Sequence, residues 1–153
     1  MELQLATIEV RRAGRNQGHA RAWLGEYGER IGRFCRFEHA VFPSEAALLQ
    51  ACARVQGRRP PLLVLLDSRG KAMTSEALAA WLDAQQSSGA QRIVFAIGPA
   101  NGWSPEARSQ AGLLLSLGTM TLAHELAAVV VAEQVYRAFT ILKGLPYHLG
   151  HSG

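Results

Sequence analysis

The chain has 153 residues, of which 48% are hydrophobic and 18% are charged, a composition typical of a globular domain with a substantial core and not of a disordered or fibrous chain. It contains no apolar run of the ~18 residues that a membrane span needs, and its first residues lack the basic start and apolar centre of a signal peptide. We therefore expect one domain over residues 1–153, located in the cytoplasm, with no membrane partner. Cys35 and Cys52 are too few and too far apart to predict a zinc knuckle or a redox pair.

The net charge of +4 is concentrated in the first half of the chain. Residues 1–71 hold 12 Lys and Arg against 7 Asp and Glu, a balance of +5, whereas residues 72–153 hold 4 against 5, a balance of −1. Most of these cations are arginines, whose planar fork of N–H donors suits phosphate oxygens. The pattern is compatible with an RNA partner, although a solvated surface would produce it as well.

Strand and helix signals alternate along the chain. Two continuous apolar runs, residues 62–66 and 93–97, have the form of strands buried on both faces of a parallel sheet. Thr74 and Ser104-Pro105 are helix-start signals, and Gly144 is a helix-stop signal. In the first half of the chain we expect a strand over about residues 2–10, a helix over 18–34 with Trp23, Tyr27 and Ile31 on one face, a strand over 36–42, a helix over 44–53 and a strand over 62–66 ended by Asp67. In the second half we expect a helix after Thr74, a strand over 93–97, a helix from Ser104, a strand over 113–115 and a helix over 124–143.

This order predicts an α/β fold with a mainly parallel sheet. In such sheets ligands bind beyond the carboxyl ends of the strands, where Asp67, Gly98 and Gly118 are expected. A phosphoacceptor aspartate would occupy the place of Asp67 in a receiver domain, but Arg11 and Arg12 stand where that domain needs an acidic pair. We therefore disfavour the receiver alternative.

Two loops after predicted strands could bind a ligand. Residues 98–102 contain two glycines, which allow close approach of a backbone to an adenine or a ribose, but they match neither the dinucleotide fingerprint nor the phosphate-binding loop. Residues 117–122 form a second loop of small and apolar side chains. Each loop could equally be a turn that only covers the core.

The last predicted helix and the residues after it carry further candidates. His124 opens the helix, where it could contact a ligand or have no role. Glu133 and Arg137 are four residues apart, so they could form an ion pair, or Arg137 could bind a phosphate. Tyr147 and His148 follow Pro146 in a tail that would fray unless it docks, for instance on a partner subunit. The spacing of His148 and His151 alone does not predict a metal site.

Taken together, these motifs resemble the ribosomal RNA large subunit methyltransferase H family of the SPOUT superfamily, which methylates N3 of a pseudouridine in 23S rRNA. The resemblance is close over residues 61–148 and loose over the first 42 residues. The matching motifs are Leu65-Leu66-Asp67 with Gly70-Lys71, Ile97-Gly98 with Gly102, Ser116 to Thr121, His124, Glu133 to Ala138, and Pro146-Tyr147-His148.

The resemblance implies helices on both faces of the sheet and a C-terminal deep trefoil knot. It also implies a homodimer, S-adenosyl-L-methionine as the cofactor, and 23S rRNA or the assembled ribosome as the partner. The implied cofactor-binding residues are Leu66, Gly98, Leu117, Gly118, Thr119, Met120, Thr121 and Leu122. The implied catalytic residues are His148, Tyr147, Arg137 and His124, with His148 assisting loss of the N3 proton or positioning the base.

Three positions depart from the family pattern. Pro99 replaces a second glycine and removes an amide donor from the loop. Ala128 and Leu149 stand where the family has basic residues, which predicts less positive charge near the RNA. The alternative function is therefore a non-catalytic or retargeted paralogue that binds the cofactor or RNA without the family's reaction.

Overall fold

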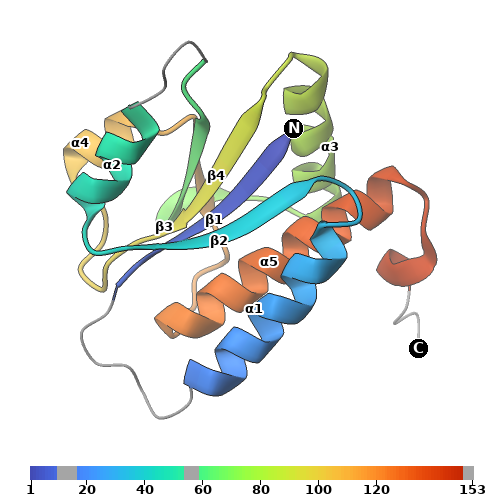
Figure 1. Cartoon of the computed structure of the whole chain (residues 1–153), viewed down its shortest axis with the longest axis horizontal. Coiled ribbons are helices and arrows are strands. Elements are labelled where there is room, and N and C mark those ends of the chain that lie inside the picture. Colours follow the sequence, from blue (N-terminus) through green and yellow to red (C-terminus); the bar gives the residue numbers. More distant parts are fainter. Residues whose placement is uncertain (10–16, 54–58, 150–153) are drawn as a thin grey trace.

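A computed structural model describes residues 1–9, 17–53 and 59–149 of the chain. In these residues one sheet of parallel strands occupies the centre of the molecule, in the order β2-β1-β4-β3-β5 (Figure 1). The strands are β1 (Glu2–Ile8), β2 (Arg36–Phe42), β3 (Leu62–Ala72), β4 (Arg92–Ile97) and β5 (Leu113–Ser116). The predicted α/β class and parallel sheet are confirmed.

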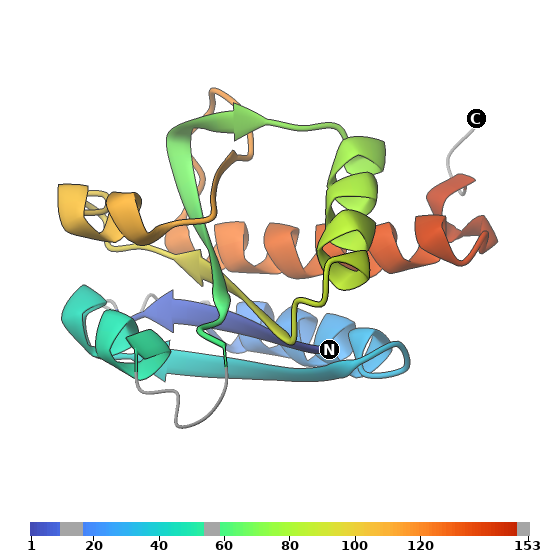
Figure 2. The ribbon, with the colours of Figure 1, turned by 90° about the horizontal axis from the view of Figure 1, so that it is seen from above.

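Helices cover both faces of the sheet, as expected. Helices α1, α3 and α5 lie on one face, and α2 and α4 lie together on the other, near one end of the strands (Figures 1 and 2). Their bounds are α1 (Gln17–Ile31), α2 (Glu45–Ala53), α3 (Ser75–Ser87), α4 (Pro105–Gln110) and α5 (His124–Leu142), followed by the short 3₁₀ helix η1 (Pro146–Leu149). None of the helices in this part of the chain has the length and apolar character needed to cross a membrane.

Side-chain alternation along β1 divides the core into two clusters. Leu3 and Leu5 point toward α1, α3 and α5 and join the larger cluster, whereas Ala6 and Ile8 point toward α2 and α4 and join the smaller one. Strand β1 pairs with both β2 and β4, so it is buried on both faces despite its polar residues. The burial of polar Gln4 is tolerated because its amide donates to the Glu38 carboxylate.

The predicted helix signals act as capping groups. The Thr74 hydroxyl accepts from the Ala77 amide at 3.0 Å at the start of α3, and the Ser104 hydroxyl accepts from the Ala107 amide at 3.1 Å at the start of α4. Gly144 ends α5 with a φ of 67°, a left-handed conformation that glycine adopts without strain. These caps fix the entry and exit of the loops near the candidate site.

Strand β3 is longer than the sequence predicted. It does not end at Asp67 but continues, after an irregularity between Leu66 and Lys71, until Lys71 and Ala72 pair with the end of β5. The continuation passes so close to β5 that a Cβ on Gly70 would lie 2.5 Å from the carbonyl oxygen of Leu114. Pairing with a strand that follows 40 residues later, which local pattern cannot show, explains the difference.

The residues on the predicted face of α1 differ in burial. Ile31 is fully buried and Leu24 is nearly so, but Trp23 is 53% exposed and stacks on Tyr27 instead of entering the core. The helix ends at Ile31, and the carbonyl of Ile31 then accepts from the amides of Phe34 and Cys35 in a tight turn. Trp23 is therefore available at the surface between α1 and α5.

Candidate functional site

A cavity of about 550 Å³ lies where the irregular part of β3 and the loops after β4 and β5 meet the start of α5. This volume is within the usual range for a small-molecule site. Seven of the eight predicted cofactor residues line it, namely Leu66, Gly98, Leu117, Gly118, Met120, Thr121 and Leu122. Thr119 belongs to the same loop but does not line the cavity. The fold therefore brings together two loops that lie about 20 residues apart in the sequence.

Trp103 holds the wall of this cavity in place. Its indole N–H donates to the carbonyl of Leu66 at 3.0 Å, and its side chain is only 6% exposed. A Cβ on Gly98 would lie 2.6 Å from the Trp103 ring, so this approach requires glycine at position 98. Trp103 thus joins the end of β3 to the loop after β4, a role that the sequence did not reveal.

The loop after β5 is shaped by Ser116. The Ser116 hydroxyl accepts from the amide of Gly118 and donates to the carbonyl of Gly118, both at 3.1 Å. Gly118 has a φ of 125°, which side chains rarely allow. The result is a fixed turn with backbone groups near the cavity, beside the exposed side chain of Met120.

Two buried polar atoms at the cavity have no hydrogen-bond partner. They are Oδ2 of Asp67 and Nε2 of His124. Burial lowers the pKa of His124, against the opposing effects of the Ile97 backbone and Glu125, so its imidazole is neutral at neutral pH. Buried polar atoms are nearly always paired, so these two atoms fit a cavity that receives a polar ligand.

The other predicted catalytic residues form a separate cluster at the far end of α5. Arg137 forms an ion pair with Glu133 at 2.8 Å, and its guanidinium carbon lies 4.9 Å from the centre of the Tyr147 ring. The Tyr147 ring packs edge-on against Tyr136, 4.6 Å away between centroids. The tail therefore docks on its own chain, and the Glu133–Arg137 pair that the spacing allowed is present.

Tyr147 is not suited to proton transfer near neutral pH. Burial, aided by a hydrogen bond with Tyr27 and by the charge of Glu133, raises its pKa to about 12. The phenol therefore keeps its proton, so Tyr147 can pack against a substrate or hydrogen-bond to it but cannot serve as a base.

His148 has a partner for one ring nitrogen only. Its Nε2 lies 3.0 Å from Oε1 of Glu76 at the start of α3, whereas its buried Nδ1 has no partner. His124 and Arg137 are separated along α5 by 13 residues, or about 20 Å. Within one chain, therefore, only His124 of the four predicted catalytic residues lies at the cavity.

An apolar groove of about 640 Å³ runs between α1 and α5. Trp23, which is 53% exposed, and Leu126, which is 52% exposed, line it together with Tyr27 and Val129. The sequence analysis missed this groove, because the two helices are 93 residues apart and the pattern of Trp23, Tyr27 and Ile31 does not show which helix their face meets. The exposure of large apolar side chains in one groove is typical of an interaction surface.

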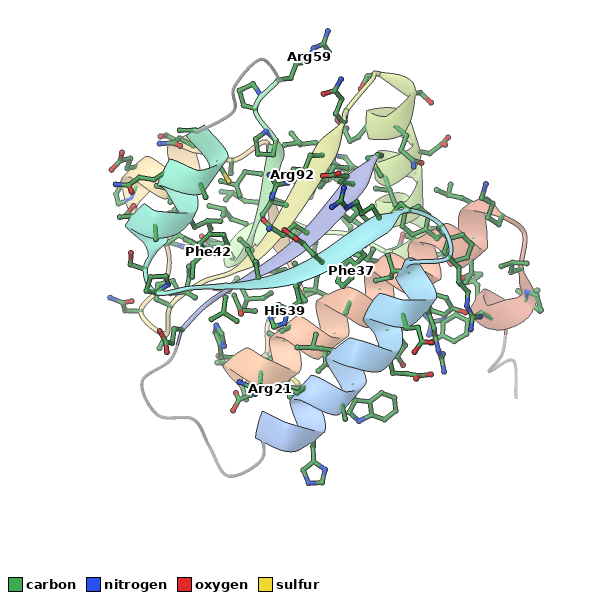
Figure 3. The ribbon with its side chains drawn as sticks, viewed as in Figure 1. Arg21, Phe37, His39, Phe42, Arg59 and Arg92 are labelled. Atoms are coloured by element: carbon green, nitrogen blue, oxygen red, sulfur yellow. The ribbon has the colours of Figure 1, made fainter. Side chains whose placement is uncertain are left out.

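The basic residues of the first half do not form one patch in the described part of the chain. Arg36 pairs with Glu2, and Arg30 pairs with Glu26. Arg59 and Arg92 lie near the amino ends of β3 and β4, around a cavity away from the carboxyl ends of the strands (Figure 3). Arg11, Arg12 and His151, and residue 10 at the end of the first predicted strand, lie outside the described residues. Within residues 1–9, 17–53 and 59–149 no group of three or more potential ligands could hold a metal ion.

The chain is a SPOUT-type methyltransferase domain, with which the parallel sheet and the cavity at its carboxyl edge are compatible. The family model described as a predicted SPOUT methyltransferase matches residues 1–148. More particularly, the chain belongs to the ribosomal RNA large subunit methyltransferase H family. It is 50% identical over 127 residues to the member from Koribacter versatilis, and the match covers 83% of this chain and 86% of that protein. It is 42% identical over 132 residues to the member from Deinococcus deserti, and the match covers 85% of this chain and 90% of that protein.

A solved structure supports the fold. The chain is similar to a probable methylase family protein from Haemophilus influenzae with a TM-score of 0.58 and 13% identity, covering 97% of this chain and 69% of that chain. At this identity the similarity concerns the fold alone. The predicted family is thus confirmed by the sequence matches, and its layered parallel sheet by the structure.

Proposed function

We propose that this protein uses S-adenosyl-L-methionine to methylate 23S rRNA, at N3 of the pseudouridine at position 1915. The observation that carries the proposal is the cavity at the carboxyl edge of the sheet, which gathers Leu66, Gly98 and the loop over residues 117–122. Membership of the methyltransferase H family supports both the cofactor and the RNA substrate. A cytoplasmic location, where ribosomes work, is part of the same proposal.

The cavity has the features that this cofactor needs. Its walls are mainly backbone and apolar groups, set by Trp103 and Ser116, and it offers the unpaired polar atoms of Asp67 and His124. S-adenosyl-L-methionine supplies a methyl group on a positively charged sulfur, which is already activated for transfer. The protein must therefore chiefly align the reactants and favour loss of the N3 proton.

His148 is the residue we assign to that proton. Glu76 holds Nε2 at 3.0 Å and so orients the ring, while Nδ1 is left without a partner and could accept the proton or a hydrogen bond. Arg137 and Tyr147 form a rigid surface next to it, on which a base could pack. The protonated Tyr147 supplies a hydrogen-bond donor and not a base.

We further propose that two copies of the chain complete one site. The tail residues lie about 20 Å along α5 from the cavity of their own chain, so a second chain is needed to place a tail at each cavity. The apolar groove between α1 and α5 starts at the cavity end of α5 and extends to Glu133, which makes it the surface we assign to dimerisation. This homodimer explains why Trp23 and Leu126 are exposed in one chain.

The proposal includes a trefoil knot in the C-terminal half. The continuation of β3 pairs with β5 and approaches its backbone closely at Gly70. Such a close approach of two backbone segments is compatible with a tightened knot. The knot can be tested separately: the native chain is cleaved with a protease, and the products are examined for a core whose segments remain entangled.

The function is tested by two measurements on the purified protein. Calorimetry should detect binding of S-adenosyl-L-methionine, and labelled cofactor should transfer its methyl group to assembled ribosomes. His148→Ala should keep the cofactor affinity and lose at least about 100-fold in transfer rate, as expected for a proton-transfer group. Unchanged turnover of this variant at saturating ribosome would exclude the role of His148, and transfer to no RNA by the native protein would exclude the enzyme.

The dimer is tested with a matched pair of variants. Leu126→Glu places a charge in the groove, whereas Val41→Glu places one at a similarly exposed apolar position, 57% exposed, on the edge strand β2. Sedimentation should show a monomer with no transfer activity for the first variant and an active dimer for the second. A fully active monomeric native protein would contradict the shared site.

A non-catalytic or retargeted paralogue is the second candidate. Leu149 favours it, because this side chain is 69% exposed at the tail where the family has a basic residue. Binding of the cofactor without transfer to any rRNA would support this candidate over the first.

A further inference from the structure

Asp67 is a buried carboxylate at the cavity to which the proposed reaction gives no role. It follows Leu66 at the irregular part of β3, its side chain is only 7% exposed, and it lines the cavity. Its Oδ1 accepts a hydrogen bond from the amide of Arg69 at 2.9 Å. This bond within a local turn fixes the orientation of the carboxylate.

The other oxygen is incompletely satisfied. Oδ2 lies 3.3 Å from Nε of Arg108 on α4, close enough for an ion pair. Yet neither Oδ2 nor Nε has a partner in hydrogen-bond geometry. A carboxylate oxygen can accept two hydrogen bonds, and leaving a buried acceptor without one is unfavourable. The carboxylate is thus held at Oδ1 by Arg69, whose Nε also lies 3.5 Å from it, and at Oδ2 by the ion pair with Arg108, but Oδ2 lacks a hydrogen-bond donor.

The unpaired oxygen belongs to a residue that lines the cavity. Both Asp67 and His124, whose Nε2 is also unpaired, line the same cavity as the predicted cofactor residues. S-adenosyl-L-methionine carries two kinds of strong donor suited to a carboxylate, namely the hydroxyls of its ribose and its ammonium group. A hydrogen bond between such a donor and an ionised carboxylate is about twice as strong as a neutral one.

We propose that Oδ2 of Asp67 accepts a hydrogen bond from an O–H or N–H group of the bound adenosyl cofactor, which makes Asp67 a side-chain ligand of the cofactor. The proposal rests on the proposed function, since it concerns the same cavity. Arg108 then acts as a positioning residue, which holds the carboxylate through the ion pair at Oδ2.

A purely structural role for Asp67 makes a different prediction. If Asp67 only clamps the end of β3 to α4 through Arg108, removing either partner should have the same effect on the cavity. If Asp67 is itself a ligand, only the loss of its carboxylate should strongly weaken cofactor binding. Asp67→Asn and Arg108→Gln separate these cases, because each breaks the ion pair but only the first replaces the acceptor by an amide.

The experiment is titration calorimetry of the native protein and both variants with S-adenosyl-L-methionine and with 5′-methylthioadenosine, which keeps the ribose but lacks the amino acid. We expect Asp67→Asn to raise the dissociation constant for S-adenosyl-L-methionine about 10-fold or more, and Arg108→Gln to raise it less than about 3-fold. An equal loss for 5′-methylthioadenosine assigns the donor to the ribose, and a loss confined to S-adenosyl-L-methionine assigns it to the ammonium group.

Equal affinities of the native protein and Asp67→Asn for both ligands would overturn the proposal, as would equal losses in the two variants. The proposed function is judged by the native protein alone: if it binds no S-adenosyl-L-methionine, that function fails and the role of Asp67 with it. If Asp67→Asn does not fold, Asp67→Ser replaces it. The ratio of affinities for the two ligands within one variant does not depend on the fraction that is folded.

Discussion

Trp103→Phe tests whether one side chain joins the two loops of the cavity. The substitution keeps an aromatic ring but removes the N–H that donates to the carbonyl of Leu66 at 3.0 Å. An unpaired buried carbonyl costs about 1–3 kcal/mol, and the smaller ring leaves a void at a position that is 6% exposed. We expect a loss of about 3 kcal/mol in the free energy of unfolding, or roughly 6–12 °C in the midpoint of thermal unfolding for a chain of this size.

The matched control is Trp81→Phe. Trp81 is half-buried on α3, packs edge-on against Phe95 at 6.4 Å, and does not line the cavity. Thermal unfolding should show a smaller loss for this variant, and calorimetry should show unchanged binding of S-adenosyl-L-methionine. Trp103→Phe should weaken that binding at least about 10-fold, because Leu66 and Gly98 lose their common support. Equal stability and equal binding of the two variants would refute the role of Trp103.

Three further predictions concern stability and reactivity. Gly70→Ala should strongly destabilise the protein in urea unfolding, because its Cβ would meet the backbone of Leu114 at 2.5 Å, whereas Gly25→Ala in open space on α1 should be neutral or slightly stabilising. Burial, with the charge of Arg21, lowers the pKa of His39 in the folded chain, so on acidification the unfolded chain gains a proton first and the stability falls as the pH drops below about 6.5. His39→Gln should therefore reduce the difference between the urea midpoints measured at about pH 7.5 and about pH 5.5. An unchanged difference would contradict this reasoning. Burial raises the pKa of Cys35 to about 11, so iodoacetamide should label this thiol much more slowly than a free cysteine at neutral pH. Fast labelling in the native state would contradict this and show that the Cys35 thiol is accessible.

The local elements could be predicted because their signals are local. Thr74 and Ser104 cap helices with their own hydroxyls, and the apolar runs over residues 62–66 and 93–97 form strands. The central position of β1 could not be predicted, since its burial depends on strands that follow much later in the sequence. Trp23 shows the same limit: helical periodicity places it near Tyr27, but only the packing of α1 on α5 decides that it remains exposed.

The candidate site was predictable in part for a similar reason. In a parallel sheet, the loops at the carboxyl ends of the strands lie at the same edge, so Gly98 and Gly118 were expected at one edge, although β3 separates the strands β4 and β5 that precede them. The separation of the tail from the cavity was not predictable, because it depends on the direction in which α5 crosses the sheet. The support from Trp103 gave no sequence signal either, since an aromatic residue in a loop is equally compatible with the core.

The three departures from the family pattern have different consequences because they lie in different surroundings. Ala128 is only 1% exposed and packs in the larger core cluster, so the loss of a basic residue there does not leave a gap in an exposed surface. Pro99 lines the cavity, and its carbonyl still accepts from the amide of Gly102 at 2.9 Å, so the turn forms without the missing donor. Leu149 alone is exposed near Tyr147 and His148.

A defect caused by Pro99 would therefore appear in cofactor binding, and a defect caused by Leu149 would appear in methyl transfer at saturating cofactor. Leu149→Arg should raise the affinity for ribosomes if the tail contacts RNA, with a gain that shrinks as salt increases.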